Sequence, residues 1–310
     1  MMTVLNILFG PVTWSSTLRM AAPILLTGVG GSFSKQTGTF CIAFECFMLS
    51  AAFFAAYGSY LTGSPYLGTL LAMLAGMLLA AIFGLFVFHL RANAMIVSIA
   101  LNFGAWAMTT LLLTTVFGER GFFFSPDIIN FPAIHLPLIQ DIPLLGGVLS
   151  GHIFLVYLAY FVAVAGYIVM YKTSFGLRLR GVGASPAGAQ TSGVNLLKYR
   201  WITVMIMGAF SGLGGAYMPL SGLSMFSENM TSGRGFLAFA AILVGRGNPF
   251  KVMLVCLLFA YTNALNMTLT NYGIPTQLLQ TLPYLTVLAA LLVSGFKYFD
   301  GKMHLREEVG

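Results

Sequence analysis

The sequence has 310 residues, of which 58% are hydrophobic and only 7% are charged. A soluble domain carries roughly 25% charged residues, so this composition excludes an ordinary soluble protein. The formal net charge is +7. However, the basic residues lie mostly in short connections between apolar runs, which favours cytoplasmic loops of a membrane protein and argues against a nucleic-acid partner.

Five long stretches carry no Asp, Glu, Lys or Arg: 46–90, 92–118, 142–171, 201–227 and 252–296. A membrane-spanning helix needs about 20 mostly apolar residues, so each stretch is long enough for one or two crossings. The sequence therefore predicts an all-α fold, a polytopic helical bundle in the lipid bilayer. We expect residues 1–310 to form a single transmembrane domain.

Apolar runs bounded by charge, glycine and proline predict about eight to ten crossings. The candidates in chain order are 14–33, 40–61, 66–88, 93–117, 151–171, 201–221, 235–248, 252–270 and 277–296. The run 235–248 is short for a full span, which is consistent with a half-helix or an inner helix buried in protein. The first run is interrupted by Arg19 and Pro23, and a second crossing hidden there would place the N-terminus in the cytoplasm.

The connections between these crossings alternate sides of the membrane. One side holds most of the basic residues, namely Lys35, Arg91, Lys172, Arg178, Arg180, Lys198, Arg200, Arg246, Lys251, Lys297, Lys302 and Arg306. Arg120 and Arg234 fall on the other side, and Arg19 lies within the first run. Because basic residues collect in cytoplasmic loops, the richer side is assigned to the cytoplasm.

Two connections are long enough to contact soluble partners. The outer one, 118–150, contains Pro126, Pro132, Pro137 and Pro143. These prolines break any continuous helix, so we expect short irregular pieces there. The inner connection is 172–200.

No catalytic or cofactor-binding pattern is present in the sequence. Glu45 is the only acid inside an apolar run, and the four histidines are scattered. Cys41, Cys46 and Cys256 lack metal-ligand spacing. No glycine-rich phosphate loop is followed by Lys and Ser or Thr, so we expect no nucleotide hydrolysis and no cofactor in this chain.

Neutral polar residues inside the crossings allow two interpretations. They are Asn102, Thr262, Asn263, Asn266, Thr268, Gln277 and Gln280. Each could hold helices together, or they could line a path for a neutral hydrophilic solute. The path candidates are Glu45, Asn102, Asn263 and Asn266, with a purely structural hydrogen bond as the alternative for Glu45. Ion-coupled transport usually needs more intramembrane ionisable groups, so the energy source is expected outside this chain.

Small residues recur at a spacing of four in the run 201–221: Gly208 with Gly212, Ser211 with Gly215, and Gly212 with Ala216. Such pairs let helices approach closely. Static packing and a seam that slides during transport both remain open.

The segment 174–195 reads SFGLRLRGVGASPAGAQTSGVN. It resembles the cytoplasmic loop of bacterial ABC-importer permeases for ribose-type sugars and nucleosides. The matching residues are Gly176, Leu177, Arg180, Val182, Gly183, Pro186, Ala189 and Gly193, whereas Gly181, Ser185 and Gly188 depart from the usual pattern.

The segment 31–48 is similar to the nucleoside branch of that family. Its matching residues are Gly31, Phe33, Ser34, Gly38, Ile42, Glu45 and Met48. Its departures are Lys35, Gln36, Cys41, Ala43 and Cys46. The stretches 208–216 and 233–249 also resemble the family, so the resemblance covers most of the chain from Gly31 to Phe296.

The resemblance implies a permease subunit of an ATP-driven importer for a nucleoside, or a simple sugar, in the bacterial cytoplasmic (inner) membrane. Its implied partners are a second permease subunit, often a paralogue in this branch, cytoplasmic ATPase subunits that bind ATP-Mg, and an outer solute-binding lipoprotein. An ion-coupled secondary carrier and a membrane enzyme or scaffold remain as alternatives.

The resemblance also implies that 172–200 contains the coupling helix seated in the ATPase. A helix that transmits closure of the ATPase must keep its shape and its contact with the ATPase. Gly181, Gly183, Pro186 and Gly193 are therefore candidate backbone determinants. Arg178 and Arg180 are candidate polar anchors, unless these basic residues only fix topology.

Overall fold

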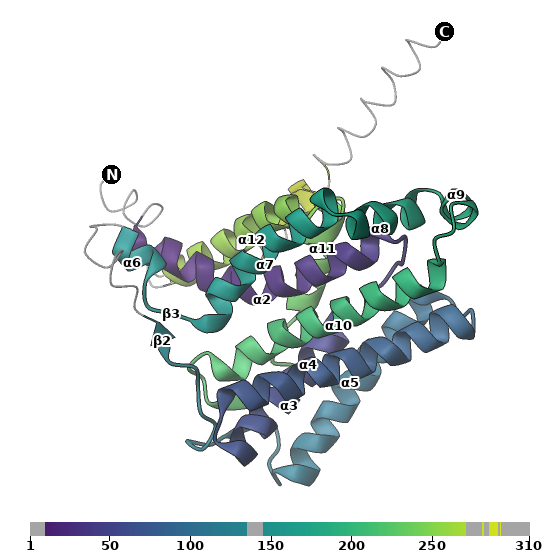
Figure 1. The fold of residues 1–310 in the computed structure, drawn as a ribbon. Coiled ribbons are helices and arrows are strands. Elements are labelled where there is room, and N and C mark those ends of the chain that lie inside the picture. The colour runs from purple at the N-terminus through teal and green to yellow at the C-terminus, as the bar shows by residue number, and fades with distance from the viewer. Residues whose placement is uncertain (1–9, 135–144, 271–280, 282–284, 291, 293–310) are drawn as a thin grey trace.

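The computed structural model describes residues 10–134, 145–270, 281, 285–290 and 292 (Figure 1). The long helices are α2 (Pro11–Gln36), α3 (Phe44–Thr62), α4 (Pro65–Gly84, continued by η1, Leu85–His89), α5 (Ala94–Val116), α7 (Phe154–Lys172), α10 (Leu196–Leu220) and α12 (Pro249–Thr270). The short helices are α6 (Leu145–Leu149), α8 (Ser174–Ala184), α9 (Pro186–Thr191) and α11 (Arg234–Val244).

Six helices of the described part are long and apolar enough to cross a membrane: α3, α4 with η1, α5, α7, α10 and α12. The predicted all-α, multi-span bundle is confirmed. The predicted crossing 277–296 and the basic residues of the tail lie outside the described residues, apart from 281, 285–290 and 292.

The first apolar run forms one continuous helix. α2 spans 26 residues with Pro23 inside it, and every residue from Ala21 to Ser34 is buried. Near its start, the Arg19 guanidinium donates a hydrogen bond to Ser15 Oγ at 3.0 Å, so the charge has a local partner. This run therefore hides no second crossing.

Helix α10 lies at the centre of the bundle, in contact with α2, α3 and α4 (Figure 1). Its glycines allow this packing. A Cβ at Gly208 or Gly212 would collide with the α4 backbone around Ala72 and Gly76. A Cβ at Gly215 would collide with the Met48 carbonyl of α3. The small residues of this run therefore serve close backbone packing in this conformation.

Short antiparallel strand pairs gather at one end of the bundle, which we call the strand end. β1 (Phe122–Phe124) pairs with β4 (Met225–Ser227), and β2 (Ala133–Ile134) pairs with β3 (His152–Ile153). These pairs tie the described part of the proline-rich segment to the chain that enters α7 and α11.

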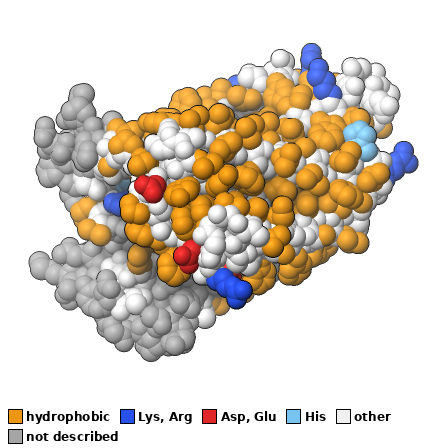
Figure 2. Space-filling view, turned by 90° about the horizontal axis from the view of Figure 1, so that it is seen from below, with side chains coloured by type: hydrophobic (Ala, Val, Ile, Leu, Met, Phe, Trp, Pro, Cys, Tyr) orange, Lys and Arg blue, Asp and Glu red, His pale blue; other side chains and the backbone are white. Residues whose placement is uncertain are grey.

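Helices α8 and α9 lie at the opposite end, which we call the basic end (Figure 1). Between the two ends, the face on the α5 side is broadly apolar, as Figure 2 shows. Large exposed side chains of α5 outside the cavity described below include Ile96 and Leu111. Such a face suits lipid or another membrane subunit, because both are apolar.

Candidate functional site

The chain between α2 and α3 enters the bundle without forming a helix. Backbone groups at membrane depth need partners inside the protein, because lipid offers none. Ser98 and Asn102, one turn apart on α5, supply them. Ser98 Oγ accepts from Ile42 N at 3.1 Å. Asn102 Oδ1 accepts from Cys46 N at 2.9 Å, and its Nδ2 donates to the Ile42 carbonyl at 3.2 Å.

Glu45, at the start of α3, in turn caps the N-terminus of α11. Its Oε1 accepts from Thr231 Oγ1 at 2.5 Å and from Gly233 N at 2.9 Å, and its Oε2 accepts from Gly235 N at 2.8 Å. A carboxylate at a helix N-terminus satisfies orphan N–H groups and complements the helix dipole. Gly235 is required because a Cβ there would collide with Glu45 itself.

The N-terminus of α11 is partly buried, with Thr231 and Gly235 buried and Gly233 half-buried. The helix has 11 residues, or about 16 Å of length, which is roughly half of a bilayer core. Its far end is held at the basic end, where Gln36 Nε2 donates to the carbonyls of Arg246 and Gly247 at 3.2 and 3.1 Å. The short run 235–248 is therefore a half-helix, as one of the two sequence interpretations predicted.

Glu45 and Asn102 both line a cavity of about 410 Å³. Helix α3 contacts both α5 and α11. Glu45 and Leu49 of α3 line the cavity, together with Ile42 in the link before that helix. Ile99, Asn102, Phe103 and Trp106 of α5 line it as well, as do Asn229, Gly233 and Phe236 at and before α11. Its volume is in the range of small-molecule sites.

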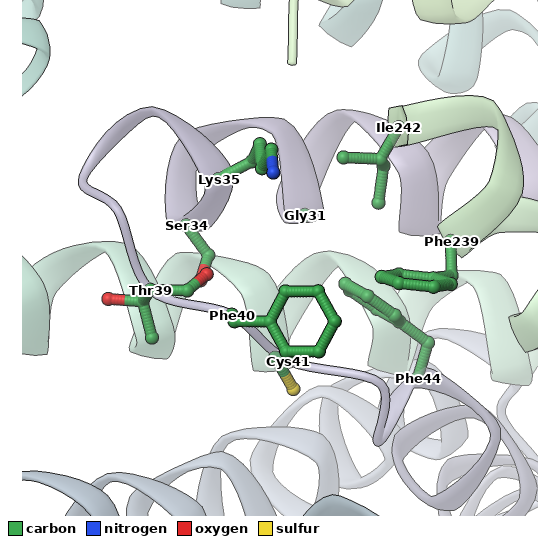
Figure 3. Close-up of a pocket in the computed structure, with 9 residues that line it drawn as sticks. All are labelled: Gly31, Ser34, Lys35, Thr39, Phe40, Cys41, Phe44, Phe239 and Ile242. Carbon is green, nitrogen blue, oxygen red and sulfur yellow. The ribbon is translucent and has the colours of Figure 1, made fainter. Parts of the chain in front are cut away.

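A second hollow lies beside the basic end and is nearly filled (Figure 3). It measures only about 10 Å³, too little for more than one water molecule. Phe40 packs edge-on against Phe239 with ring centroids 5.7 Å apart, and Phe44 lies 6.3 Å from Phe239. These three rings close the space between the 37–43 link and α11 in this conformation.

The other two path candidates lie elsewhere. Asn263 and Asn266 are on α12, which packs on α2, α7 and α11, whereas Asn102 is on α5, which packs on α3 and α4. Asn263 Nδ2 donates to the Phe259 carbonyl of its own helix at 3.1 Å. The structure therefore brings Glu45 and Asn102 together at one cavity and leaves the α12 amides apart from it.

The predicted coupling segment contains α8 and α9, joined by a sharp corner. Ser185 Oγ accepts from Gly188 N at 3.2 Å and so caps α9, with Pro186 in its first turn. Gly193 has a φ of +77°, which favours glycine after the helix. A Cβ at Gly183 would collide with the Gln36 carbonyl at the end of α2, whereas Gly181 has open space around it.

The two coupling arginines differ in their surroundings. Arg180 lies over the Tyr171 ring, 4.7 Å from its centroid, and its Nε donates to the Gly176 carbonyl at 3.4 Å. Arg178 is exposed. Arg180 thus has a local structural role that the sequence did not reveal.

Sequence reasoning missed Thr231, Gly233 and Gly235 as the partners of Glu45. The signal was a Thr-Ser-Gly-Arg-Gly run just before a short apolar helix, opposite a lone carboxylate. It also missed Trp106, Asn229 and Phe236 at the cavity. Among the described residues, no group of three or more His, Cys, Asp or Glu side chains is placed to hold a metal ion.

Residues 13–292 match the family described as the permease component of a branched-chain amino acid transport system. The chain belongs to this permease family. The resemblance in the segments 31–48 and 174–195 is thereby confirmed at the level of a transport permease. The permease is a multi-pass membrane protein, and the enzyme alternative is set aside in favour of a transporter subunit.

Relatives of the permease match over most of its length. It is 32% identical to the guanosine ABC transporter permease protein NupQ of Bacillus subtilis, covering 91% of this chain and 90% of that protein. It is 31% identical to the nucleoside ABC transporter permease protein NupC of Lactococcus lactis, covering 89% and 90%. It is 28% identical to the putative glucose ABC transporter permease protein TsgC13 of Haloferax volcanii, covering 89% of each.

A solved structure of an inward-facing, putative metal-chelate type ABC transporter has a similar fold. The TM-score is 0.51 with 16% identity, and the match covers 93% of this chain and 89% of that one. At this identity the likeness concerns the fold alone.

Proposed function

We propose that the permease is the membrane-spanning subunit of an ATP-driven importer for a nucleoside, with a simple sugar as the second candidate. The observation that carries this proposal is the match, over about nine-tenths of the chain, to permeases named for guanosine and for nucleosides. The second candidate stems from the relative named for glucose. ATP-Mg would bind to separate ATPase subunits.

The neutral character of the cavity supports this substrate class. Asn102 and Asn229 contribute amides to its lining, and Glu45 already has three hydrogen-bond donors. Amides can hydrogen-bond a neutral hydrophilic solute without trapping a charge. We infer that Glu45 and Asn102 lie beside the translocation path, which a second permease subunit would complete.

The basic end supports a coupling role for α8 and α9. The exposed α9 would seat in the ATPase, and α8 abuts the end of α2 at Gly183. Gln36, the last residue of α2, also holds the C-terminal end of α11 through two hydrogen bonds. Displacement of α8 would therefore reach both the 37–43 link and the half-helix that flank the cavity.

Uptake of radiolabelled guanosine tests the proposal. The permease would be expressed with the genes for its ATPase, second permease and binding protein in cells lacking nucleoside uptake. We expect uptake that stops when ATP is depleted, persists with a proton uncoupler while ATP is maintained, and is competed by unlabelled nucleosides. Uptake competed only by glucose would favour the sugar, and uptake that survives ATP depletion would favour a secondary carrier.

A further inference from the structure

We propose that the cavity between α3, α5 and α11 is the membrane site that holds the nucleobase of the passing solute. The binding groups assigned here are the rings of Trp106, Phe103 and Phe236 and the amide of Asn229. This inference rests on the proposed nucleoside import and adds the residues that recognise the solute inside the membrane.

Aromatic side chains line this cavity from two helices. Phe103 and Trp106 belong to α5 and Phe236 to α11. Phe103, Trp106 and Phe236 are 66%, 49% and 47% exposed, respectively. Packing within the chain therefore leaves part of each ring free. A base stacked on an aromatic ring gains about 1–3 kcal/mol, largely independent of base identity. Rings with free faces at a lined cavity therefore fit a flat heteroaromatic solute better than a sugar alone.

Asn229 supplies a polar group that the fold does not use. Its φ of +52° places it in the left-handed region, and the turn it forms is held by its backbone carbonyl, which accepts from Ser232 Oγ at 3.1 Å. Within the described part of the chain, its side-chain amide makes no hydrogen bond, and the residue is exposed at the cavity. An amide offers both donors and an acceptor, which match the edge of a base.

The occupied N-terminus of α11 disfavours phosphorylated solutes. A half-helix N-terminus is ordinarily a binding site for anions. Here the carboxylate of Glu45 occupies it, accepting from Gly233 N and Gly235 N. A phosphate entering the cavity would therefore find these N–H groups already occupied by a carboxylate. The site is built for neutral nucleosides and against nucleotides.

Ligand protection of an introduced cysteine tests the site directly. The complete importer would carry Ile99→Cys, at a cavity-lining position that is 42% exposed, and labelling by a small water-soluble thiol reagent would be measured in proteoliposomes. The three native cysteines are at most 4% exposed, so the wild-type importer is the labelling control. We expect guanosine or uridine to slow the labelling at least fivefold, while ribose and guanosine 5′-monophosphate at the same concentration leave it unchanged.

Transport kinetics provide a second, independent test. Trp106→Ala should raise the KM for guanosine uptake about tenfold, the equivalent of 1.4 kcal/mol of lost stacking. Trp106→Phe keeps a ring and should stay within threefold. Met108→Ala, an exposed position of the same helix outside the cavity, should match the wild type.

The two proposals fail in different ways. If the wild-type importer takes up no nucleoside, the proposed function fails and the site with it. If it takes up guanosine but neither Trp106→Ala nor Phe236→Ala alters KM and no nucleoside protects Ile99→Cys, the base-binding site is wrong while nucleoside import stands. Equal protection by ribose would overturn the assignment of the cavity to the base.

Discussion

Single polar residues fix the non-helical parts of this membrane protein. Asn102 satisfies the backbone before and within the first turn of α3, and Glu45 in that turn satisfies the start of α11. The first turns of α3 and α11 are thus each stabilised by a side chain from a neighbouring helix. Because the first turns of both helices are largely buried, loss of either side chain leaves N–H groups unpaired.

Glu45 variants should separate its charge from its hydrogen bonds. Glu45→Ala removes every acceptor for Thr231, Gly233 and Gly235, each unpaired donor costing about 1–3 kcal/mol. Glu45→Gln keeps one carbonyl oxygen but turns an NH₂ toward a donor, so we expect a smaller loss of about 1–3 kcal/mol. The aggregation temperature of the detergent-solubilised protein measures this, with Glu119→Ala in an exposed loop as the control. An Ala variant as stable as the wild type would contradict the capping role.

His152, at the strand end, should make stability depend on pH. Burial lowers its pKa, a bond to Val148 opposes this, and Arg19 adds to the lowering. Nε2 lies 2.7 Å from the Val148 carbonyl, while Nδ1 is buried and has no hydrogen-bond partner in the described part of the chain.

Because the folded state resists protonation of His152, its contribution is complete above the unfolded pKa of about 6.5 and is lost as the pH falls below that value. We expect the aggregation temperature of the wild type to drop between pH 7 and pH 5. His152→Gln should show a shallower drop, and His89→Gln, at an exposed position, should follow the wild type. Parallel curves for wild type and His152→Gln would refute this.

Among the elements, helix α8 has a sharply defined contact with the end of α2. Two of its glycines, two residues apart, differ completely: Gly183 abuts the end of α2, and Gly181 faces open space. The sequence could not separate them, because both lie in the same loop motif and the difference arises from a tertiary contact.

We predict that Gly183→Ala reduces uptake and substrate-stimulated ATPase activity several-fold, because the added Cβ must displace α8 from Gln36. Gly181→Ala should keep full activity and gain up to about 1 kcal/mol of helix stability. Both activities would be measured in the assembled importer, with membrane insertion checked by immunoblot. Equal behaviour of the two variants would remove Gly183 from the coupling route.

The elements that the sequence predicted well are those governed by apolar length. Within the described residues, the long charge-free runs form helices, and the short run 235–248 contains most of the half-helix α11. The site was predictable only in part. Glu45 and Asn102 stood out as polar residues in apolar runs, but the rings and amide that complete the cavity lie in stretches without a local signal. Their meeting depends on how α3 brings α5 and α11 together.

Across the whole molecule, the two ends should face opposite sides of the membrane. Basic residues assign the α8–α9 end to the cytoplasm. Gln190→Cys in α9 should react with an impermeant thiol reagent only in inside-out vesicles, and Glu119→Cys only in intact cells, since both positions are exposed. The buried native cysteines give the background in each case. Labelling of Gln190→Cys from outside would reverse the topology.

The glycine seams of α10 have a consequence for how the permease can move. Where α10 meets α2, α3 and α4, its glycines bring backbone against backbone: Gly214 approaches the Pro23 carbonyl, Gly215 the Met48 carbonyl and Gly208 the Gly76 carbonyl. Sliding along such a seam would drive carbonyls into Cα atoms, so these four helices are expected to travel as one rigid body. The change between inward and outward access is then expected to occur where α5, α11 and the 37–43 link contact this rigid body. These contacts are made through hydrogen bonds that can be exchanged.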